Sequence, residues 1–139
     1  MGLPLYEPGL DADLTGQYWR GFQEQELRLP YCRDCENNHW YPLRLCPHCY
    51  SSAIGWRAVS GHGIIYTWVE VDYHFNLPFF EDEVPFYAGL VVPEENDGIR
   101  IPAILDFVIT EPEIGTEVAV EFRRSADGLD YPVFRPVDP

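Results

Sequence analysis

The sequence predicts a mainly β protein with a short N-terminal helix, a small segment held by a metal ion and a five-stranded barrel. All four cysteines fall in one stretch between Cys32 and Cys49. After that stretch, short apolar runs alternate with turn-forming Gly, Pro, Asn and Asp, and no run of helix length separates them. At 139 residues the chain has room for about one ordinary domain, or two small ones that share a core.

A helix is expected over residues 11–24, where Leu14, Tyr18 and Phe22 recur every four residues and would share one face. Together with Trp19, these residues give the helix a broad aromatic side. Two interpretations of that side remain open: it covers the chain's own core, or it contacts a partner subunit. Two residues are candidate N-caps for this helix: Asp11 and Asp13.

The cysteines form two Cys-x-x-Cys pairs, Cys32 with Cys35 and Cys46 with Cys49. Two cysteines three residues apart on a tight turn can direct both sulfurs at one ion, so the two pairs predict one tetrahedral zinc site. A closed shell of four thiolates leaves no position for a reacting water, and the zinc would therefore be structural. Disulfides and an iron centre are the alternatives, and the location inferred below argues against disulfides.

Histidines do not form a recognisable catalytic motif in this sequence. His39 and His48 lie inside the cysteine cluster and are expected to be solvent-exposed loop residues rather than zinc ligands, because four thiols already suffice. His62 and His74 have no nearby cysteine outside the cluster, no Gly-rich nucleophile elbow and no recognisable serine partner. Independent catalysis by this chain is therefore the less favoured interpretation.

The C-terminal part predicts a small barrel of five strands, and an OB-like barrel fits that number. In the fourth strand Val118, Val120 and Phe122 alternate with charged residues, so this strand should be half exposed. Pro102 cannot donate to a strand ladder and indicates an edge or a bulge in the third strand. The expected strands are His62–Val71, Phe86–Val92, Ile99–Ile109, Glu117–Arg123 and Tyr131–Phe134.

The charge is one-sided, with nine basic residues, all arginine, against 23 acidic ones and a formal net charge of −14. Nucleic-acid affinity depends largely on basic side chains that displace counterions, so a nucleic-acid partner is not expected. No apolar stretch approaches the roughly 20 residues that span a bilayer, which argues against a membrane. The N-terminus has no basic region followed by an apolar core, so we expect a cytoplasmic protein.

The order of these parts resembles the zinc-ribbon OB-fold family of proteins associated with acyl-CoA enzymes. The resemblance implies an N-terminal helical segment (1–28), a rubredoxin-like zinc ribbon (29–57) and an OB-fold barrel (58–139). It covers nearly the whole chain. The segments that carry it are Tyr18-Trp19, Phe22, Leu29–Cys32, Cys46–Cys49, Trp56, Val59–Thr67, Pro85–Val92 and Pro132–Pro136.

The resemblance also implies a function in lipid metabolism. Members of the family assemble as hetero-oligomers with thiolase-like catalytic subunits, in thiolase complexes or in aldolase complexes of steroid side-chain degradation. There they support the catalytic subunit and help to form a path for acyl-CoA. The sequence departs from the family at Glu36 and Tyr50, where glycine usually follows the second and fourth cysteines, and Asn37 or Asn38 is expected to absorb part of the left-handed backbone.

A second candidate surface is the loop 72–85, which joins two expected strands and is rich in aromatic residues. Long aromatic loops on small barrels are typically functional, so this one is expected to touch the partner or line an acyl-CoA passage; a flap over the barrel's own end is the alternative. A bulky substrate would suit such a loop, which favours an aldolase slightly over a thiolase. The residues of interest there are Tyr73, His74, Phe75, Phe79 and Phe80.

Coenzyme A carries phosphates that usually need Arg, Lys or helix N-termini. If a CoA thioester binds here, the partner is expected to supply much of the phosphate recognition, since few cations are available: Arg44, Arg57, Arg100, Arg123 and Arg124. Two other functions remain as alternatives to the accessory subunit. One is a nucleic-acid-binding zinc-ribbon OB protein, whose affinity would fall steeply with salt, and the other is a stand-alone enzyme.

Overall fold

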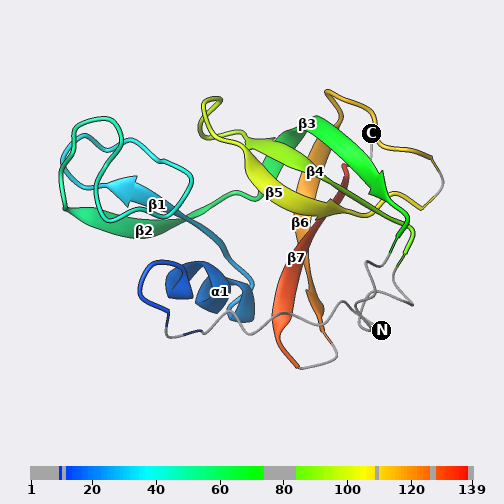
Figure 1. The fold of residues 1–139 in the computed structure, drawn as a ribbon, viewed down its shortest axis with the longest axis horizontal. Helices are drawn as coiled ribbons and strands as arrows, with labels where there is room; N and C mark the ends of the chain where they lie inside the picture. Colours follow the sequence, from blue (N-terminus) through cyan, green and yellow to red (C-terminus); the bar gives the residue numbers. More distant parts are fainter. Residues whose placement is uncertain (1–9, 11, 74–83, 109, 126–127, 138–139) are drawn as a thin grey trace.

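The computed structural model describes residues 10, 12–73, 84–108, 110–125 and 128–137. Figure 1 shows a two-stranded ribbon at one end, a barrel at the other and a single helix beneath the junction between them. The expected mainly β architecture is confirmed. In chain order the elements are α1 (Gly16–Gln23), β1 (Leu27–Cys32), β2 (Ile54–Val59), β3 (His62–Val71), β4 (Phe86–Pro93), β5 (Ile101–Leu105), β6 (Glu117–Arg124) and β7 (Asp130–Pro136).

The helix α1 is shorter than its sequence pattern suggests. It begins after Thr15, which occupies the N-cap position without a side-chain cap hydrogen bond. Asp13 pairs instead with Arg44 at 2.8 Å, and Asp11 lies outside the described residues. A Cβ atom at Gly16 would lie only 2.5 Å from the carbonyl oxygen of Leu10. This glycine is therefore required by the close approach of the chain that enters the helix, which offsets its poor helix propensity.

The barrel is closed, with strand order β3-β4-β5-β7-β6. All neighbouring strands are antiparallel except β5 and β7, which pair in parallel through Ile104 with Val133 and Leu105 with Phe134. Pro102 pairs with Leu90 of β4 but lies ahead of the short β7 ladder. The edge expected at this proline is confirmed, because a residue without an N–H group stands where β5 has no second neighbour.

The third strand is correspondingly shorter than the expected Ile99–Ile109. Its first two residues belong to the turn after β4, where the amide of Ile99 donates to the carbonyl of Asn96 at 3.3 Å. The strand ends at Leu105. The apolar run in the sequence continues beyond it, which shows that hydrophobicity alone overestimated the strand.

One hydrophobic core joins the barrel to the N-terminal part of the chain. Phe22 of α1 and Leu27 and Leu29 of β1 belong to the same cluster of buried side chains as the barrel residues. The expected alternation in β6 is confirmed, because Val118 is fully buried, while Val120 and Phe122 pack against this core. The two-stranded ribbon β1–β2 therefore rests on a base that is continuous with the barrel interior.

Candidate metal centre and aromatic surface

The cysteines lie in two turns that repeat the same hydrogen-bond pattern. The amide of Cys32 donates to the carbonyl of Asn37 at 3.0 Å, and the amide of Cys46 donates to that of Ser51 at 2.8 Å. Four residues after each of these cysteines, an amide donates back to its carbonyl: Glu36 to Cys32 at 2.8 Å and Tyr50 to Cys46 at 2.9 Å. The repeated pattern makes the two turns equivalent halves of one site.

Both residues that replace the family's glycine adopt the left-handed backbone conformation themselves. The φ angle is +64° at Glu36 and +63° at Tyr50. The expectation that Asn37 or Asn38 would absorb this demand is wrong. The return hydrogen bonds to Cys32 and Cys46 fix the conformation at the residue directly after each Cys-x-x-Cys pair, so the next residues cannot take it over.

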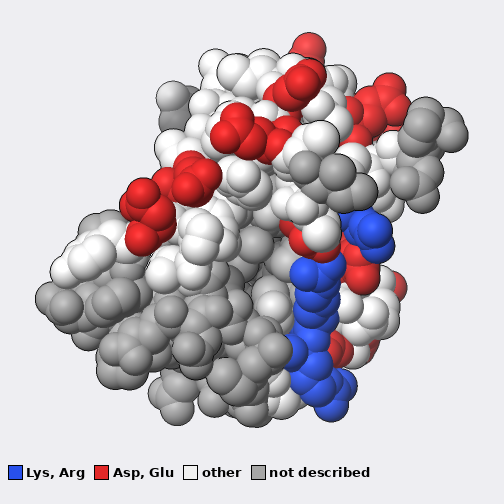
Figure 2. Space-filling view, turned by 90° about the vertical axis from the view of Figure 1, so that its right-hand side faces the viewer, with Lys and Arg blue, Asp and Glu red and all other residues white. Residues whose placement is uncertain are grey.

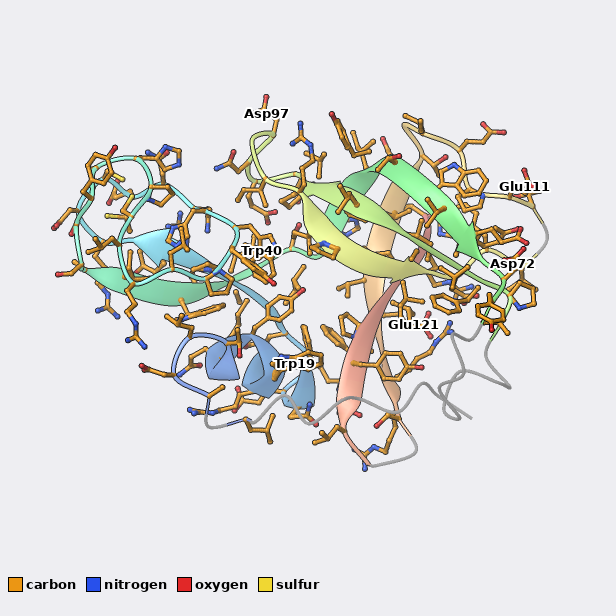
Figure 3. The ribbon with its side chains drawn as sticks, viewed as in Figure 1. Trp19, Trp40, Asp72, Asp97, Glu111 and Glu121 are labelled. Atoms are coloured by element: carbon orange, nitrogen blue, oxygen red, sulfur yellow. The ribbon has the colours of Figure 1, made fainter. Side chains whose placement is uncertain are left out.

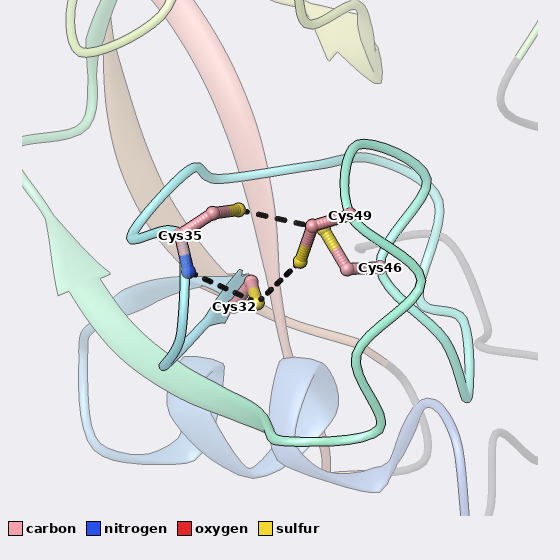
Figure 4. A group of neighbouring side chains, drawn as sticks. All are labelled: Cys32, Cys35, Cys46 and Cys49. Carbon is pink, nitrogen blue, oxygen red and sulfur yellow. Dashed lines mark hydrogen bonds between the residues drawn. The ribbon is translucent and has the colours of Figure 1, made fainter.

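The four sulfur atoms converge on one point, as Figure 4 shows, and all lie within 4.8 Å of one another. The Sγ atoms of Cys32 and Cys49 are 3.6 Å apart, as are those of Cys35 and Cys46. These separations are far longer than a disulfide bond of about 2.05 Å. Four sulfurs at about 2.3 Å from a tetrahedral zinc ion would be about 3.8 Å apart, so the cluster fits one zinc ion and leaves no open ligand position.

Backbone amides orient the thiols toward the centre. The amide of Cys35 donates to the Cys32 sulfur at 3.4 Å, and that of His48 donates to the Cys46 sulfur at 3.3 Å. The hydrogen bond from the Cys35 amide lowers the pKa of the Cys32 thiol to about 7. At Cys49 the Ser51 amide favours the thiolate, but desolvation and the three neighbouring thiols together raise the pKa to about 12. A cation among these thiols would favour the ionised form of all four, so binding would release protons.

Of the two histidines inside the cluster, one lies where expected and one does not. His48 is exposed, but His39 is only 3% exposed, which corrects the expectation of a solvent-exposed loop residue. Neither ring nitrogen of His39 has a hydrogen-bond partner among the described residues. Desolvation, followed by repulsion from His48, lowers the pKa of His39. Its side chain is buried because the loop after the Cys32–Cys35 turn packs between the ribbon and the barrel.

A contact between the ribbon and the barrel explains this burial. The side chain of Asn96, in the turn between β4 and β5, donates to the carbonyl of Asn38 at 3.4 Å. A cavity of about 180 Å³ lies at the same junction, and its lining includes His39, His48 and Asn96. On the ribbon side, Arg57 of β2 donates to the Asn38 side chain at 3.0 Å. No local pattern in the sequence signals these contacts, because they join residues far apart in the chain.

The aromatic side of α1 divides between core and surface. Phe22 is fully buried, which favours the interpretation that this residue covers the chain's own core. Tyr18 and Trp19 are partly buried against the core, and desolvation raises the pKa of Tyr18. Trp40, which the sequence did not single out, joins them with its ring centroid 4.6 Å from that of Tyr18. Figure 3 shows Trp19 and Trp40 near the junction of the helix, the ribbon and the barrel.

These rings form one wall of an apolar pocket of about 390 Å³. Across the pocket lie Pro102 and Ile104 of β5 and Tyr131 and Pro132 of β7, where the β5–β7 ladder is short. Among the residues that the structure describes, none that lines the pocket is charged. Of the aromatic loop, Tyr73 is 51% exposed. The other four residues singled out there lie outside the described residues: His74, Phe75, Phe79 and Phe80.

The arginines considered for phosphate recognition all have partners within the chain. Arg44 pairs with Asp13, Arg123 with Asp106 and Arg124 with Asp130. Arg57 and Arg100 stack on tyrosine rings at 4.4 and 4.1 Å. On the face shown in Figure 2, the basic side chains gather in one stripe, and acidic side chains form separate groups over the upper part of the view and beside the stripe. Among the described residues, no helix is long and apolar enough to cross a bilayer.

The fold and the cysteine cluster define a zinc-ribbon OB-fold protein, and comparison with known proteins agrees with this class. Residues 19–55 match the family described as the rubredoxin-like zinc ribbon domain of ChsH2. Residues 56–123 match the C-terminal OB-fold domain of ChsH2. The chain belongs to this ChsH2 zinc-ribbon OB-fold family, as the sequence resemblance indicated. The three segment boundaries that the resemblance implied stay a prediction.

Two solved structures are similar over most of the chain. The first, described as an Ltp2–ChsH2(DUF35) aldolase, is 25% identical with a TM-score of 0.79. The match covers 90% of this chain and 95% of the chain in that structure. The second is a DUF35-family protein of unknown function from Sulfolobus solfataricus, 12% identical with a TM-score of 0.58. This match covers 82% of this chain and 81% of the chain in that structure, and at this identity it supports the fold and no statement about function. No curated protein matches the sequence.

Proposed function

We propose that this chain is a non-catalytic accessory subunit of an acyl-CoA complex, in which it binds a thiolase-fold aldolase or thiolase and supports that catalytic subunit. The observation that carries the proposal is the likeness to the ChsH2(DUF35) aldolase structure, which extends over 90% of this chain and 95% of the other. A likeness of this extent includes the helix, the ribbon and the barrel, and not the metal site alone.

The zinc in this proposal is structural and is held by Cys32, Cys35, Cys46 and Cys49. The cluster supports this role because four thiolates complete a tetrahedral shell and leave no site for water or substrate. The ribbon beyond β1 and β2 consists of irregular loops, so a bound ion would supply much of its folding free energy. The metal would fix the ribbon against the barrel rather than take part in the reaction.

The acyl-CoA substrate in this proposal reaches the catalytic subunit past the aromatic surface of this chain. The uncharged pocket beside Tyr18, Trp19 and Trp40 would suit the apolar acyl part, including the side chain of a steroid. All five arginines considered above already have intramolecular partners. The phosphates of coenzyme A are therefore assigned to the catalytic subunit, and carbon–carbon cleavage of a bulky acyl-CoA remains the preferred reaction over thiolysis.

The test is purification of the tagged chain from its own source under native conditions, with mass spectrometry of the bound proteins and metal analysis. The expected result is a thiolase-fold subunit in stoichiometric amount and one zinc ion per chain. Bound RNA, released by raised salt, would instead support the nucleic-acid alternative. Turnover of an acyl-CoA by the isolated chain would support the stand-alone enzyme.

A further inference from the structure

The outer surface of β3, β4 and β5 is mostly apolar along its cross-strand rows, with one cation at its edge, Arg100, which directly precedes β5 and stacks on Tyr66 of β3. The inner face is fixed by Ile65, Val91 and Ile101, which lie opposite one another and are almost fully buried. Because side chains alternate between the two faces of a strand, the residues next to these in sequence point away from the barrel interior. Their cross-strand rows are Ile64 with Val92, Thr67 with Leu90 and Pro102, and Val69 with Ala88 and Ile104.

The strand β4 is apolar on both of its faces, which is typical of a strand covered on both sides rather than of one that faces water. Its outward residues are Phe86, Ala88, Leu90 and Val92. The neighbouring strand β3 exposes large apolar side chains on the same surface, with Ile64 46% exposed and Val69 59% exposed. We call this surface, formed by the outward residues of β3, β4 and β5, the apolar face.

The opposite side of the same barrel has the pattern of a water-facing sheet. Outward residues of β6 and β7 form ion pairs, with Arg135 binding Glu121 at 3.0 Å. Arg123, the next outward residue of β6 after Glu121, pairs with Asp106. One barrel therefore has an ion-paired side and a mostly apolar side, and the difference cannot be attributed to composition.

Acidic side chains border the apolar face at both ends of its strands. Asp72 follows the end of β3, and Glu94 and Asp97 lie in the turn between β4 and β5. Figure 3 shows Asp72 and Asp97 at opposite ends of the three strands. None of these three carboxylates forms an ion pair with a described arginine. The nearest cation, Arg100, stacks on Tyr66 and donates to backbone carbonyls.

The dimensions fit the centre of a protein interface. Three strands at about 4.8 Å spacing and eight residues at about 3.3 Å rise give roughly 380 Å². A stable interface buries about 800 Å² on each partner, with an apolar centre and a polar rim. The acidic ends would supply part of that rim. The pocket beside Trp19 adjoins the apolar face through Ala88 and Ile104, and offers a place for an anchoring side chain.

We infer that the apolar face is the surface on which the catalytic partner of this chain docks, through an apolar patch flanked by lysine or arginine side chains. This inference rests on the function proposed above and adds to it the surface and the charge of the partner. The charge of the rim decides between occupants. A second copy of this chain would bring its own acidic ends toward the same rim, whereas a partner with basic flanks would neutralise them.

The test measures the affinity between this chain and the catalytic subunit identified by native purification, with the two proteins produced separately. Val69→Arg and Ile64→Arg place a cation on the apolar face at positions exposed enough to leave the barrel intact. We expect each to weaken binding at least tenfold, with an unchanged thermal midpoint. The matched control is Val137→Arg on the β6 side, where the Val137 amide pairs with the Glu117 carbonyl, and it should change affinity less than twofold.

The other possible results distinguish failure of the proposed function from failure of the docking inference. If the wild-type chain binds no catalytic subunit, the proposed function fails and this inference fails with it. If the wild type binds and both face variants bind equally well, only the inference fails. Dimers of the isolated chain that Val69→Arg dissociates would assign the face to a second copy. Binding of a hydrophobic dye that appears only when residues 74–83 are replaced by a Gly-Ser linker, and that Val69→Arg abolishes, would assign the face to the chain itself.

Discussion

Replacing Glu36 by glycine is expected to stabilise the folded, metal-bound ribbon. Glu36 holds a φ of +64°, and its hydrogen bonds within the described part of the chain involve its backbone alone: the amide donates to the Cys32 carbonyl and the carbonyl accepts from Arg57. A left-handed conformation costs an L-residue about 1–2 kcal/mol. Glycine avoids this cost but loses about 0.5–1 kcal/mol more chain entropy on folding. The net gain is about 0.5–1 kcal/mol.

Tyr50 offers an independent repeat of the same experiment. Its φ is +63° and its side chain is 77% exposed, so Tyr50→Gly removes little packing. The double variant should gain about 1–2 kcal/mol if the two turns contribute additively. A gain of 1.4 kcal/mol corresponds to about a tenfold change in an equilibrium constant, which competition with a chromophoric chelator can resolve for zinc.

The control is Asn37→Gly, one residue further along, where φ is not positive. It should destabilise the ribbon, because the added chain entropy has no strain to offset and the Asn37 side chain no longer donates to the Cys35 sulfur, 3.6 Å away. Stabilisation by Asn37→Gly together with no gain from Glu36→Gly would refute the reasoning and would place the left-handed residue at Asn37.

Three further predictions concern the metal, the core and the buried histidine. Removal of zinc by a chelator, or the substitution Cys46→Ser, should unfold the ribbon, and cobalt should give a sulfur-to-metal charge-transfer band in the wild type that the variant weakens. Phe22→Ala should cost about 3–5 kcal/mol in urea unfolding because the ring is fully buried, whereas Tyr50→Ala should cost little. Since burial lowers the pKa of His39, the unfolded chain takes up the proton first, and stability is lost as pH falls through the unfolded pKa near 6.5. His39→Leu should therefore lose less stability than the wild type between pH 7.5 and 5.5, and an equal loss in both would contradict this origin.

The parts of the fold that depend on local pattern could be predicted from the sequence. Two Cys-x-x-Cys turns predict one cluster because the spacing itself directs the sulfurs, and the alternation around Val118 and Phe122 predicts a half-buried strand. Pro102 predicts an edge because a residue without an N–H group cannot donate a hydrogen bond to a neighbouring strand. These features required no knowledge of which distant segments meet.

The remaining features depend on contacts between distant residues. The burial of His39 follows from the contact between Asn96 and the ribbon, which no spacing in the sequence indicates. Trp40 becomes part of the aromatic surface only because α1 packs across from it. The apolar face shows in the sequence as a continuous apolar run at Phe86–Pro93, but such a run cannot tell which of its two sides covers the core until the register is known.

The side chains of Phe22, Leu27 and Leu29 share one core with the barrel, so the ribbon is not a detachable module. A barrel produced without the residues before β3 would lack these three side chains and would open its interior to water. Folding of the two parts is therefore expected to be cooperative, and the supply of metal to the ribbon would then decide whether the barrel can present any surface to a partner at all.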